Sequence, residues 1–427
     1  MTTKKLDVYL NKIFAGVLEQ NSSGGGALSF TYDEKYLKSA SPAPISASLP
    51  LRNEPFGNKP TKSFFSGLLP DEMQRDILAK KLKLSPENVF ALLAEVGRDC
   101  AGSIEILHKG KKPPSYDEGS VEPLSADRLY EILGKIYTNP MIVEGGSVRI
   151  SLAGAQSKQA VFFDEKKKSL PQLVKEKPST HILKPPILGL ADSSENEFFC
   201  MKLAGKVGLE VAEVFLRKIQ DRPYLLVRRY DRTKFEGKTI RIHQEDFCQA
   251  LGLPPESKYQ GKDGGPGILD CLKLIEKNSS FIARDQTRFL QAVIFNYLIG
   301  NSDAHGKNFS FLHEGEKTRL APLYDLLSAE AYEYLGTSKM EHNMAMKIDK
   351  IYDPDRLYLE HWHSIVGNTK TAQTNLNKEL KSFATKLPKA AAALQEKLEK
   401  EGISSEIFPR IRQVINKRSR RILGYFL

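Results

Sequence analysis

The sequence is poor in cysteine and has no long apolar run. Its four cysteines, Cys100, Cys200, Cys248 and Cys271, nowhere form a CxxC pair, so we expect no zinc ribbon, dithiol redox site or disulfide scaffold. The longest unbroken apolar run, at 89–94, has six residues, whereas a membrane-spanning helix needs about 20. The first residues also lack the hydrophobic stretch of a signal peptide. These absences predict a protein of a reducing compartment, such as the bacterial cytoplasm, with no membrane segment.

Acidic residues are in deficit. The 427-residue chain has 63 Lys and Arg against 52 Asp and Glu, which gives a formal charge of +11, and 41% of its residues are hydrophobic. This hydrophobic fraction is ordinary for a globular protein and excludes a disordered chain. The length predicts two or three domains. The positive excess favours polyanionic partners, such as nucleic acid, phosphates or an anionic membrane, and carries no information about the fold.

Three blocks follow one another along the chain. Residues 1–110 begin with alternating strand patterns, continue into helices and lead into a polar linker rich in Lys, Gly and Pro. Residues 111–275 alternate strands and helices. Residues 276–427 are mostly helical and close on a tail that holds six Lys and Arg and no acidic residue.

Hydrophobic periodicity predicts the individual elements. Strands are expected at 6–10, 13–18, 30–32, 103–107, 148–152, 160–163, 181–184, 224–227 and 309–312. Helices are expected at 70–82, 89–96, 194–207 and 284–299, the last of them ending at Gly300. Five prolines between 42 and 60 predict an extended stretch there.

The sharpest chemical signal is the segment 301–308, NSDAHGKN, between an amphipathic helix and a short strand. An Asp followed five residues later by an Asn is the catalytic-loop spacing of phosphotransferases, in which the Asp orients the hydroxyl or accepts its proton and the Asn holds a metal ion. Asp325 follows 17 residues after Asn308, where a kinase keeps its second metal-binding Asp. Asp303 and Asn308 are also common turn formers, so the interpretation depends on Asp325.

A glycine turn in the middle block is a candidate phosphate-binding loop. Residues 151–158, SLAGAQSK, stand between two expected strands, and their small side chains would let backbone N–H groups approach phosphate oxygens. The pattern is neither a Walker A motif nor GxGxxG, and a plain hairpin turn fits it equally well.

A lysine and a glutamate of the middle block could form the Lys–Glu pair of kinases. Lys184 ends an apolar strand, and Glu195 and Glu197 open the next helix, so either carboxylate could hold the lysine against ATP phosphates. An exposed lysine at a strand end and a solvated helix start are the alternative for each residue taken alone. The order glycine turn, strand lysine, helix glutamate, linker strand, DxxxxN and Asp is nevertheless that of a bilobal kinase.

With these motifs the sequence resembles the HipA-type toxin serine/threonine kinases of bacterial toxin–antitoxin systems. The resemblance covers the whole chain, including 1–110, which looks like the N-terminal subdomain of that family. The matching segments are RISLAGAQSK (149–158), THILK (180–184), ENEF (195–198), RYDR (229–232), QED (244–246), KY (258–259), DGGPG (263–267), DAHGKN (303–308) and YD (324–325).

The resemblance implies roles for several of these positions. Asp303 would be the catalytic base, and Asn308 and Asp325 would hold Mg²⁺. Tyr230 follows the hinge strand and would pack on the adenine, while His305 is expected to brace the catalytic loop rather than act as a base. The residues expected to bind ATP are Ala153, Gly154, Ala155, Gln156, Lys158, Lys184, Arg228, Tyr230, His305 and Lys307.

Ser151 falls at the serine that the family autophosphorylates, in the loop over the phosphates. A phosphoserine adds about −1.5 to −2 charge, which would repel the ATP phosphates and could eject the loop. The resemblance therefore implies that phosphorylation of Ser151 inactivates the kinase.

Three further patterns each have a structural and a functional interpretation. His361 and His363 form an HxH pattern, for which a helix-surface or core contact is more common than a metal site. The segment 244–246 is expected to cap the following helix rather than bind substrate. The basic tail is either a solvated helix face or a contact to DNA phosphates. Its candidate DNA contacts are Arg418, Arg420 and Arg421.

The sequence thus predicts an α/β (α+β) protein of bilobal, protein-kinase-like fold. Its parts would be a β-rich N-terminal subdomain at 1–110, a nucleotide-binding region with linker and hinge at 111–275, and a mostly helical C-terminal lobe with the catalytic loop and basic tail at 276–427. The expected reaction is Mg²⁺-dependent transfer of phosphate from ATP to a serine or threonine of a protein.

By resemblance, the acceptor would be an aminoacyl-tRNA synthetase, and growth arrest would follow. The same resemblance implies a small helix-turn-helix (HipB-like) antitoxin as partner and operator DNA bound through that complex. Two alternatives stay open: a small-molecule phosphotransferase with the same machinery, and a non-catalytic co-repressor subunit of a DNA-bound complex.

Overall fold

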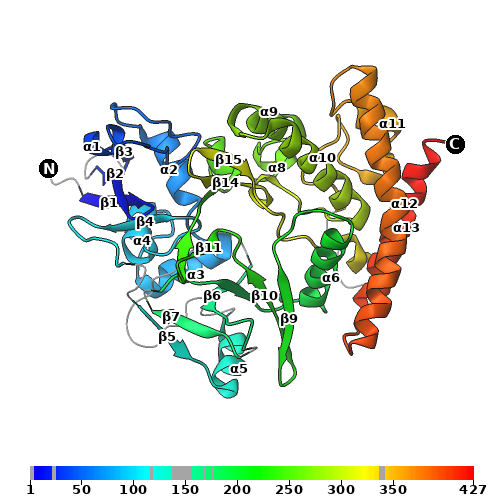
Figure 1. The fold of residues 1–427 in the computed structure, drawn as a ribbon, viewed down its shortest axis with the longest axis horizontal. Helices are drawn as coiled ribbons and strands as arrows, with labels where there is room; N and C mark the ends of the chain where they lie inside the picture. Colours follow the sequence, from blue (N-terminus) through cyan, green and yellow to red (C-terminus); the bar gives the residue numbers. More distant parts are fainter. Residues whose placement is uncertain are drawn as a thin grey trace. The chain divides into compact units, whose positions relative to one another are not determined.

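The computed structural model describes residues 4–21, 26–115, 119–136, 156–167, 169–175, 177–335 and 342–427. The chain is a mixed α/β protein, many of whose elements are labelled in Figure 1, and it divides into two compact units. The first unit comprises Met1–Pro185, Arg217–Glu256 and Ser310–Arg319, and the second comprises Pro186–Leu216, Ser257–Phe309 and Leu320–Leu427.

An antiparallel sheet opens the first unit. Its strands, in the order β3-β2-β1-β4, are β1 (Lys4–Leu10), β2 (Ile13–Gln20), β3 (Leu28–Tyr32) and β4 (Ile104–His108). Asn11 and Lys12 adopt φ values of 51° and 68°, because a two-residue hairpin turn with this backbone matches the twist of the strands. The strands expected at 6–10, 13–18, 30–32 and 103–107 are confirmed.

Four helices belong to the same part of the chain. They are α1 (Glu34–Leu37), α2 (Asn58–Ser66), α3 (Glu72–Leu82) and α4 (Val89–Val96). The prediction of an extended stretch up to Pro60 was wrong for α2, because Pro60 lies in the first turn of that helix, where its missing N–H is not needed. Phe64 and Phe65 of α2 are fully buried, and the Phe65 ring lies 5.7 Å from that of Phe30 on β3.

A six-stranded sheet, in the order β5-β7-β6-β8-β10-β9, carries the candidate lysine. Its strands are β5 (Ser120–Pro123), β6 (Gln159–Phe162), β7 (Gln172–Lys175), β8 (His181–Lys184), β9 (Val214–Ile219) and β10 (Arg222–Arg228), and helix α5 (Ala126–Lys135) precedes β6. The strands expected at 160–163, 181–184 and 224–227 are confirmed, and β7 was not predicted. The strand expected at 148–152 lies outside the described residues.

A buried cluster of charges joins the chain after β10 to the turn before β4. The Asp231 carboxylate accepts hydrogen bonds from the Gly102 N–H (2.8 Å) and from Nε and Nη2 of Arg229 (2.9 and 2.7 Å), and it pairs with Arg232 at 2.9 Å. Burial alone would raise the pKa of Asp231, but the two guanidinium groups overcome it and hold that pKa well below its usual range. Arg241 donates from Nε to the Gly102 carbonyl at 3.0 Å. The β-rich N-terminal segment therefore supports the chain on either side of Tyr230.

Two small sheets complete the strands. The first pairs β11 (Arg232–Phe235) with β12 (Lys238–Arg241), and the second has the order β13-β14-β15, with β13 (His243–Asp246), β14 (Ser310–Glu314) and β15 (Lys317–Leu320). Asp246 caps the short helix α7 (Phe247–Ala250) in a capping box with Gln249, as expected for 244–246. Glu245 is buried and accepts hydrogen bonds from the Ala47 N–H (3.0 Å) and the Ser46 hydroxyl.

The buried imidazole of His243 predicts a loss of stability in mild acid. Burial, together with the neighbouring His313, lowers the pKa of His243 to about 3, against about 6.5 in an unfolded chain. Below pH 6.5 the unfolded chain therefore binds a proton that the folded chain does not, so this contribution to stability is full above about pH 6.5 and falls by about 1.4 kcal/mol per pH unit towards pH 3. Urea unfolding across this range is expected to show a shallower pH slope in His243→Gln, and equal slopes would contradict the assignment.

The second unit is mainly helical. Its α-helices are α6 (Ser193–Lys206), α8 (Gln260–Asp263), α9 (Ile268–Asn278), α10 (Ile282–Ile299), α11 (Leu359–His363), α12 (Lys370–Lys400) and α13 (Ile407–Gly424). The 3₁₀ turns are η1 (Gly306–Asn308), η2 (Glu330–Leu335) and η3 (Pro354–Arg356). The long helix α12 lies beside α13 (Figure 1), and Phe199 of α6 stacks on Phe408 of α13 at 4.8 Å.

The cysteines are divided between the two units, with Cys100 and Cys248 in the first and Cys200 and Cys271 in the second. All four cysteines of the chain are free thiols and buried, as expected for a protein without a disulfide scaffold. Within the described part of the chain, no helix is both long enough and apolar enough to cross a membrane.

Candidate active site

Helix α10 delivers the catalytic-loop candidate. The helix ends at Gly300, whose left-handed φ of 69° turns the chain out of the helix axis. A Cβ at this position would lie 2.7 Å from Cβ of Glu330 and 2.8 Å from Cγ1 of Val414. Both the backbone conformation and the space therefore require glycine at the start of the loop.

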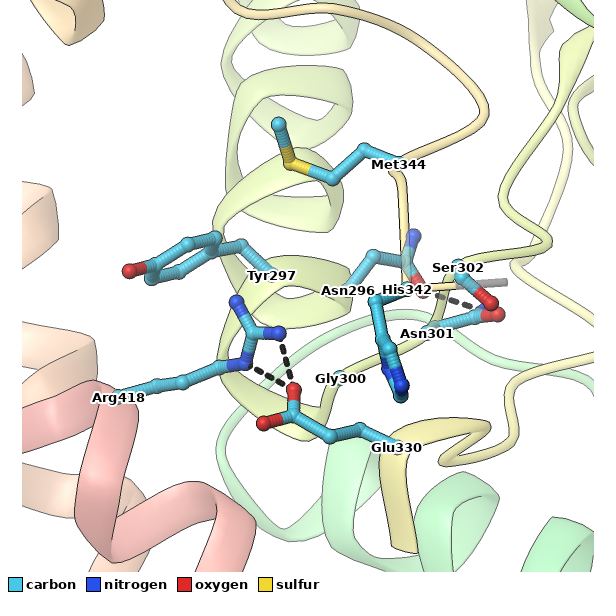
Figure 2. A pocket seen from close by; sticks show the side chains of 9 residues that line it. All are labelled: Asn296, Tyr297, Gly300, Asn301, Ser302, Glu330, His342, Met344 and Arg418. Atoms are coloured by element: carbon cyan, nitrogen blue, oxygen red, sulfur yellow. Dashed lines mark hydrogen bonds and ion pairs between the residues drawn. The ribbon is translucent and has the colours of Figure 1, made fainter. Parts of the chain in front are cut away.

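Side-chain amides fix the first residues of the loop. Asn301 donates from Nδ2 to Oδ1 of Asn296 (2.9 Å), and its own Oδ1 accepts the Asp303 N–H at 3.0 Å. Figure 2 shows Asn296 and Asn301 on one wall of a small pocket, with the buried ion pair of Glu330 and Arg418 on the other. The Glu330 N–H also donates to the Gly300 carbonyl at 3.0 Å. The backbone of Asp303 is thus held through two buried asparagines.

The Asp303 carboxylate lies at the surface of this braced loop. Its side chain is 46% exposed, and Oδ1 accepts a hydrogen bond from the Tyr259 hydroxyl. Nε2 of His305 lies 3.9 Å from the same oxygen, and the His305 ring packs edge-on against that of Tyr259 at 5.0 Å. His305 therefore lies where a bracing residue is expected, and the carboxylate keeps exposed area for an acceptor.

Asn308 carries an unsatisfied oxygen. Its Oδ1 is buried and has no hydrogen-bond partner among the described residues, although a buried polar atom normally has one. An amide oxygen of this kind is a ligand that Mg²⁺ accepts in proteins. Tyr324 ties the neighbouring segment to this position, because its hydroxyl donates to the Lys307 carbonyl at 2.7 Å. Asp325, which follows Tyr324, has a left-handed φ of 54°. Non-glycine residues seldom adopt this backbone conformation, and those that do cluster at functional sites.

The segment of Asp325 is anchored on both sides within the second unit. Leu323 exchanges backbone hydrogen bonds with Glu210 and Ala212 (2.9 and 2.8 Å). Asn196 of α6 donates from Nδ2 to the Ser328 carbonyl (2.9 Å), and its Oδ1 accepts the Ser328 N–H (2.8 Å). The helix that carries Glu195 and Glu197 is thus attached to the loop that carries Asp325.

The expected nucleotide residues of the first unit are described in part. Lys184 is only 4% exposed at the end of β8, between β6 and β10. Gln156 donates from Nε2 to the Pro185 carbonyl at 3.1 Å, and Lys158 is half-buried. Ser151 and the expected phosphate contacts Ala153, Gly154 and Ala155 lie outside the described residues.

Arg228 and Tyr230 flank the end of the expected hinge strand. The Arg228 guanidinium pairs with the Glu165 carboxylate, which also lies 3.1 Å from Nε2 of His181. Tyr230 is half-buried between the buried residues Arg229 and Asp231. Glu165 was not anticipated from the sequence, where it stands in the exposed-looking run 164–168.

The three tail arginines occupy different environments. Arg418 is only 4% exposed and pairs with Glu330. The prediction that Arg418 contacts DNA is therefore not supported, because a buried guanidinium cannot reach a phosphate of a bound duplex. Arg421 donates to the Leu357 carbonyl at 3.0 Å, and Arg420 is exposed.

The two histidines of the HxH pattern have structural partners. His361 accepts the Tyr358 N–H at Nδ1 (2.9 Å), and His363 lies 2.9 Å from Oδ1 of Asn377. Among the described residues, no group of three His, Cys, Asp or Glu side chains could hold a metal ion.

Sequence reasoning missed the residues that support the loop. The role of Asn301 could have been predicted from the sequence, since the side chain of an Asn often accepts the backbone N–H two residues later, here that of Asp303, in an Asx turn. Tyr259 stands in the KY segment, for which the sequence predicts no role. Asn196 lies between Glu195 and Glu197, and the residue type alone does not indicate a buried contact to Ser328. The partnership of Glu330 with Arg418, 88 residues later, has no local signal at all.

Replacing Gly300 by Ala is expected to destabilise the second unit and to slow catalysis. The left-handed conformation costs a non-glycine residue about 1–2 kcal/mol, and the close approach to Glu330 and Val414 adds an overpacking cost of about 1–3 kcal/mol. Thermal melting and initial rates would measure both effects. Gly402→Ala is the matched control, because Gly402 has a φ of +79° with no atom within 4 Å of an added Cβ. Equal losses in the two variants would contradict the packing argument.

Comparisons with known proteins agree with this geometry. A sequence model of the HipA-like C-terminal domain matches residues 150–394, and one of the HipA N-terminal domain matches residues 6–107. Y4mE of Sinorhizobium fredii, a protein named as a candidate kinase, is 39% identical over 401 residues, which are 93% of each chain. The serine/threonine-protein kinase toxin HipA of Shewanella oneidensis is 30% identical over 402 residues, 91% of this chain and 89% of its own.

A solved structure shows the same fold. A chain of the Shewanella oneidensis HipA, HipB and operator DNA complex matches with a TM-score of 0.82 at 28% identity, over 98% of each chain. The protein-kinase-like α/β fold expected from the sequence is thereby confirmed. With both domain matches in place and relatives of nearly equal length, the chain belongs to the HipA family of kinases.

Proposed function

We propose that this protein is an ATP- and Mg²⁺-dependent serine/threonine-protein kinase and the toxin of a toxin–antitoxin module. The observation that carries the proposal is the buried, unpartnered Oδ1 of Asn308, five residues after the exposed and braced carboxylate of Asp303. A turn-forming Asn would satisfy its own oxygen locally. An oxygen left without a partner fits a metal ligand of the kinase type.

In the proposed mechanism the chain positions groups and places charge, which is how phosphoryl transfer is catalysed. Asp303 orients the acceptor hydroxyl and takes its proton. Asn308 and Asp325 hold Mg²⁺, which when bound neutralises charge on the phosphate oxygens. Lys184 contacts the ATP phosphates, and Glu195 or Glu197 holds the lysine in place.

The nucleotide contacts follow the family resemblance. Gln156 and Lys158, with the loop before them, would cover the phosphates, while the backbone and ring of Tyr230 would bind the adenine. Because the Arg228 side chain pairs with Glu165, Arg228 would contact the adenine through its backbone. His305 and Lys307, in the catalytic loop, would lie beside the phosphates.

We propose further that Ser151 is the autophosphorylation site and that its phosphate inactivates the enzyme. The support is its place in the SLAGAQSK segment, where a charge of about −1.5 to −2 would oppose the ATP phosphates. Intact-mass analysis and peptide mapping after incubation with ATP test this step. Active enzyme that carries no phosphate on Ser151 would contradict it.

The proposed antitoxin and operator DNA rest on the named relatives, and the proposed acceptor rests on the family resemblance alone. The Shewanella relative is called a toxin, and the matching solved structure contains HipB and operator DNA. We propose a helix-turn-helix antitoxin, operator DNA bound through it, and an aminoacyl-tRNA synthetase as the cytoplasmic acceptor. Arg420, and in part Arg421, would add contacts to DNA phosphates that carry no sequence information.

Phosphoproteomics of cells that briefly express the chain tests the proposed function. Wild type and an inactive variant, Asp303→Asn, are compared at equal protein level. We expect a small set of serine or threonine sites that rise only with wild type. Phosphorylated metabolites without protein sites would indicate a small-molecule kinase instead, and no difference between the two strains would indicate a non-catalytic subunit.

A further inference from the structure

A short segment of the second unit contacts the catalytic carboxylate from outside its loop. Tyr259 precedes α8, and its hydroxyl donates to Oδ1 of Asp303, 44 residues away in the sequence. The ring of Tyr259 lies edge-on to that of His305, with an angle of 85° between the rings. The hydroxyl therefore has a defined direction, set by ring packing within the catalytic loop.

The backbone around Tyr259 is held by the glycine-rich motif that follows it. The Tyr259 carbonyl accepts the N–H groups of Asp263 (3.1 Å) and Gly265 (3.0 Å), which closes a tight turn. Gly264 has a left-handed φ of 69°, and a Cβ on Gly265 would lie 2.7 Å from both C and O of Lys258. Two consecutive glycines thus allow the chain to fold back on the residue next to Tyr259.

The same turn is also joined to the catalytic loop by its backbone. The Gly306 N–H donates to the Lys258 carbonyl at 3.4 Å, and Lys258 is only 6% exposed. The catalytic loop and the 258–265 turn are therefore attached at two points, one through the backbone and one through the Tyr259 hydroxyl.

We propose that Tyr259 is a positioning residue of the phosphoryl-transfer site. Its hydrogen bond occupies Oδ1 of Asp303 and fixes the rotation of the carboxylate, which leaves Oδ2 for the acceptor hydroxyl. This inference rests on the proposed kinase function. The KY and DGGPG segments then have a common purpose, since the glycines hold the turn and the turn holds the tyrosine.

The proposed step moves one proton to Asp303 and one phosphoryl group to the acceptor. The acceptor O–H gives its proton to Oδ2 of Asp303, its oxygen forms a bond to the γ-phosphorus of ATP, and the bond from that phosphorus to the β,γ-bridging oxygen breaks, so ADP leaves. Tyr259 keeps its own proton throughout. A carboxylate free to rotate would present the wrong oxygen part of the time, and small errors in placement slow such reactions strongly.

The test compares the full-length wild type with Tyr259→Phe, which keeps the ring and its packing on His305. ADP formation and phosphate incorporated into the chain are followed with MgATP as the only added substrate, and their initial rates, before phosphorylated Ser151 accumulates, give kcat and the KM for ATP. We expect kcat to fall about tenfold while the KM for ATP and the melting temperature stay unchanged. Gly265→Ala is expected to lower kcat in the same way, because it displaces the turn.

Two further variants separate positioning from a general structural role. In an Asp303→Asn background, Tyr259→Phe is expected to cost nothing further, since residues that act as a unit are not additive. Tyr425→Phe is the matched control, because it removes a tyrosine hydroxyl of the same unit that donates to the Leu357 carbonyl at 2.8 Å rather than to Asp303. It is expected to leave kcat unchanged.

Every other result counts against the inference. An unchanged kcat in Tyr259→Phe, with active wild type, overturns the positioning role and leaves the proposed kinase function intact. A faster variant also overturns it, and would mean that the tyrosine competes with the acceptor for Asp303. Wild type that forms no ADP and gains no phosphate would instead reject the proposed function itself.

Discussion

Replacing Asp303 by Asn is expected to lower the rate of phosphoryl transfer by about 10³-fold while ATP still binds. The substitution keeps the shape of the side chain, so the hydrogen bonds of the Asp303 backbone with Asn301 and His305 remain. What is lost is the charge that orients the acceptor hydroxyl and the site that takes its proton. Single-turnover phosphate incorporation, measured together with the Kd for MgATP, separates the two effects.

A matched substitution keeps this result specific. Asp349 is also an aspartate of the second unit, is exposed, and has a φ of 56° that asparagine tolerates well. Asp349→Asn is expected to leave both the rate and the Kd unchanged. If Asp303→Asn turned over ATP at the wild-type rate, Asp303 would not be the base and the family mechanism would not apply to this loop.

Replacing Asp231 by Asn is expected to reduce the free energy of unfolding by about 3–5 kcal/mol. The variant leaves the buried side chains of Arg229 and Arg232 without the carboxylate that they share, while Arg232 keeps Asp99 at 3.4 Å. Because the folded pKa of Asp231 is depressed, the stabilisation is complete above the unfolded value of about 3.9 and is lost as the pH falls below it. Urea unfolding at pH 7 and pH 3.5 is expected to show a large difference from wild type at pH 7 and a smaller one in acid.

An exposed ion pair provides the control for this experiment. Glu122 lies 2.8 Å from Lys175, with side chains 44% and 51% exposed, so Glu122→Gln is expected to change stability by no more than about 0.5 kcal/mol.

Asp231→Asn should also weaken ATP binding, because Tyr230 lies between Arg229 and Asp231. A variant as stable as wild type at pH 7 would show that the cluster contributes no net stability.

The sequence predicts the individual helices and strands of this protein better than the contacts between distant residues. Strands β1 and β2 were recognised from the strand pattern of their sequences and the turn between them, although residues 6–10 of β1 are buried on both faces. The end of α10 was recognised because glycine is the usual residue there. Helix α2 was missed because Pro60 and the four prolines before it suggested an extended chain, whereas Pro60 fits the first turn of the helix and Phe64 and Phe65 are buried.

The residues of the candidate site differ in the same way in how far the sequence predicts them. Asp303, Asn308 and Asp325 could be predicted because their chemistry depends on residue type and short spacing. Tyr259 and Arg418 could not, since each meets its partner across 44 and 88 residues respectively, and no local pattern records such a contact. Arg418 illustrates the difference, because a basic tail suggests solvent or DNA while one of its arginines is buried against Glu330.

The attachment of α6 to the Asp325 loop has a consequence for how this enzyme can be switched. Asn196 satisfies both backbone groups of Ser328, and both residues are fully buried. Moving α6 away would break both hydrogen bonds, and each group that stayed buried without a partner would cost about 1–3 kcal/mol. This penalty opposes an inactive state in which α6 leaves the Asp325 loop. A covalent modification or a bound partner that used such a state would have to supply at least that free energy.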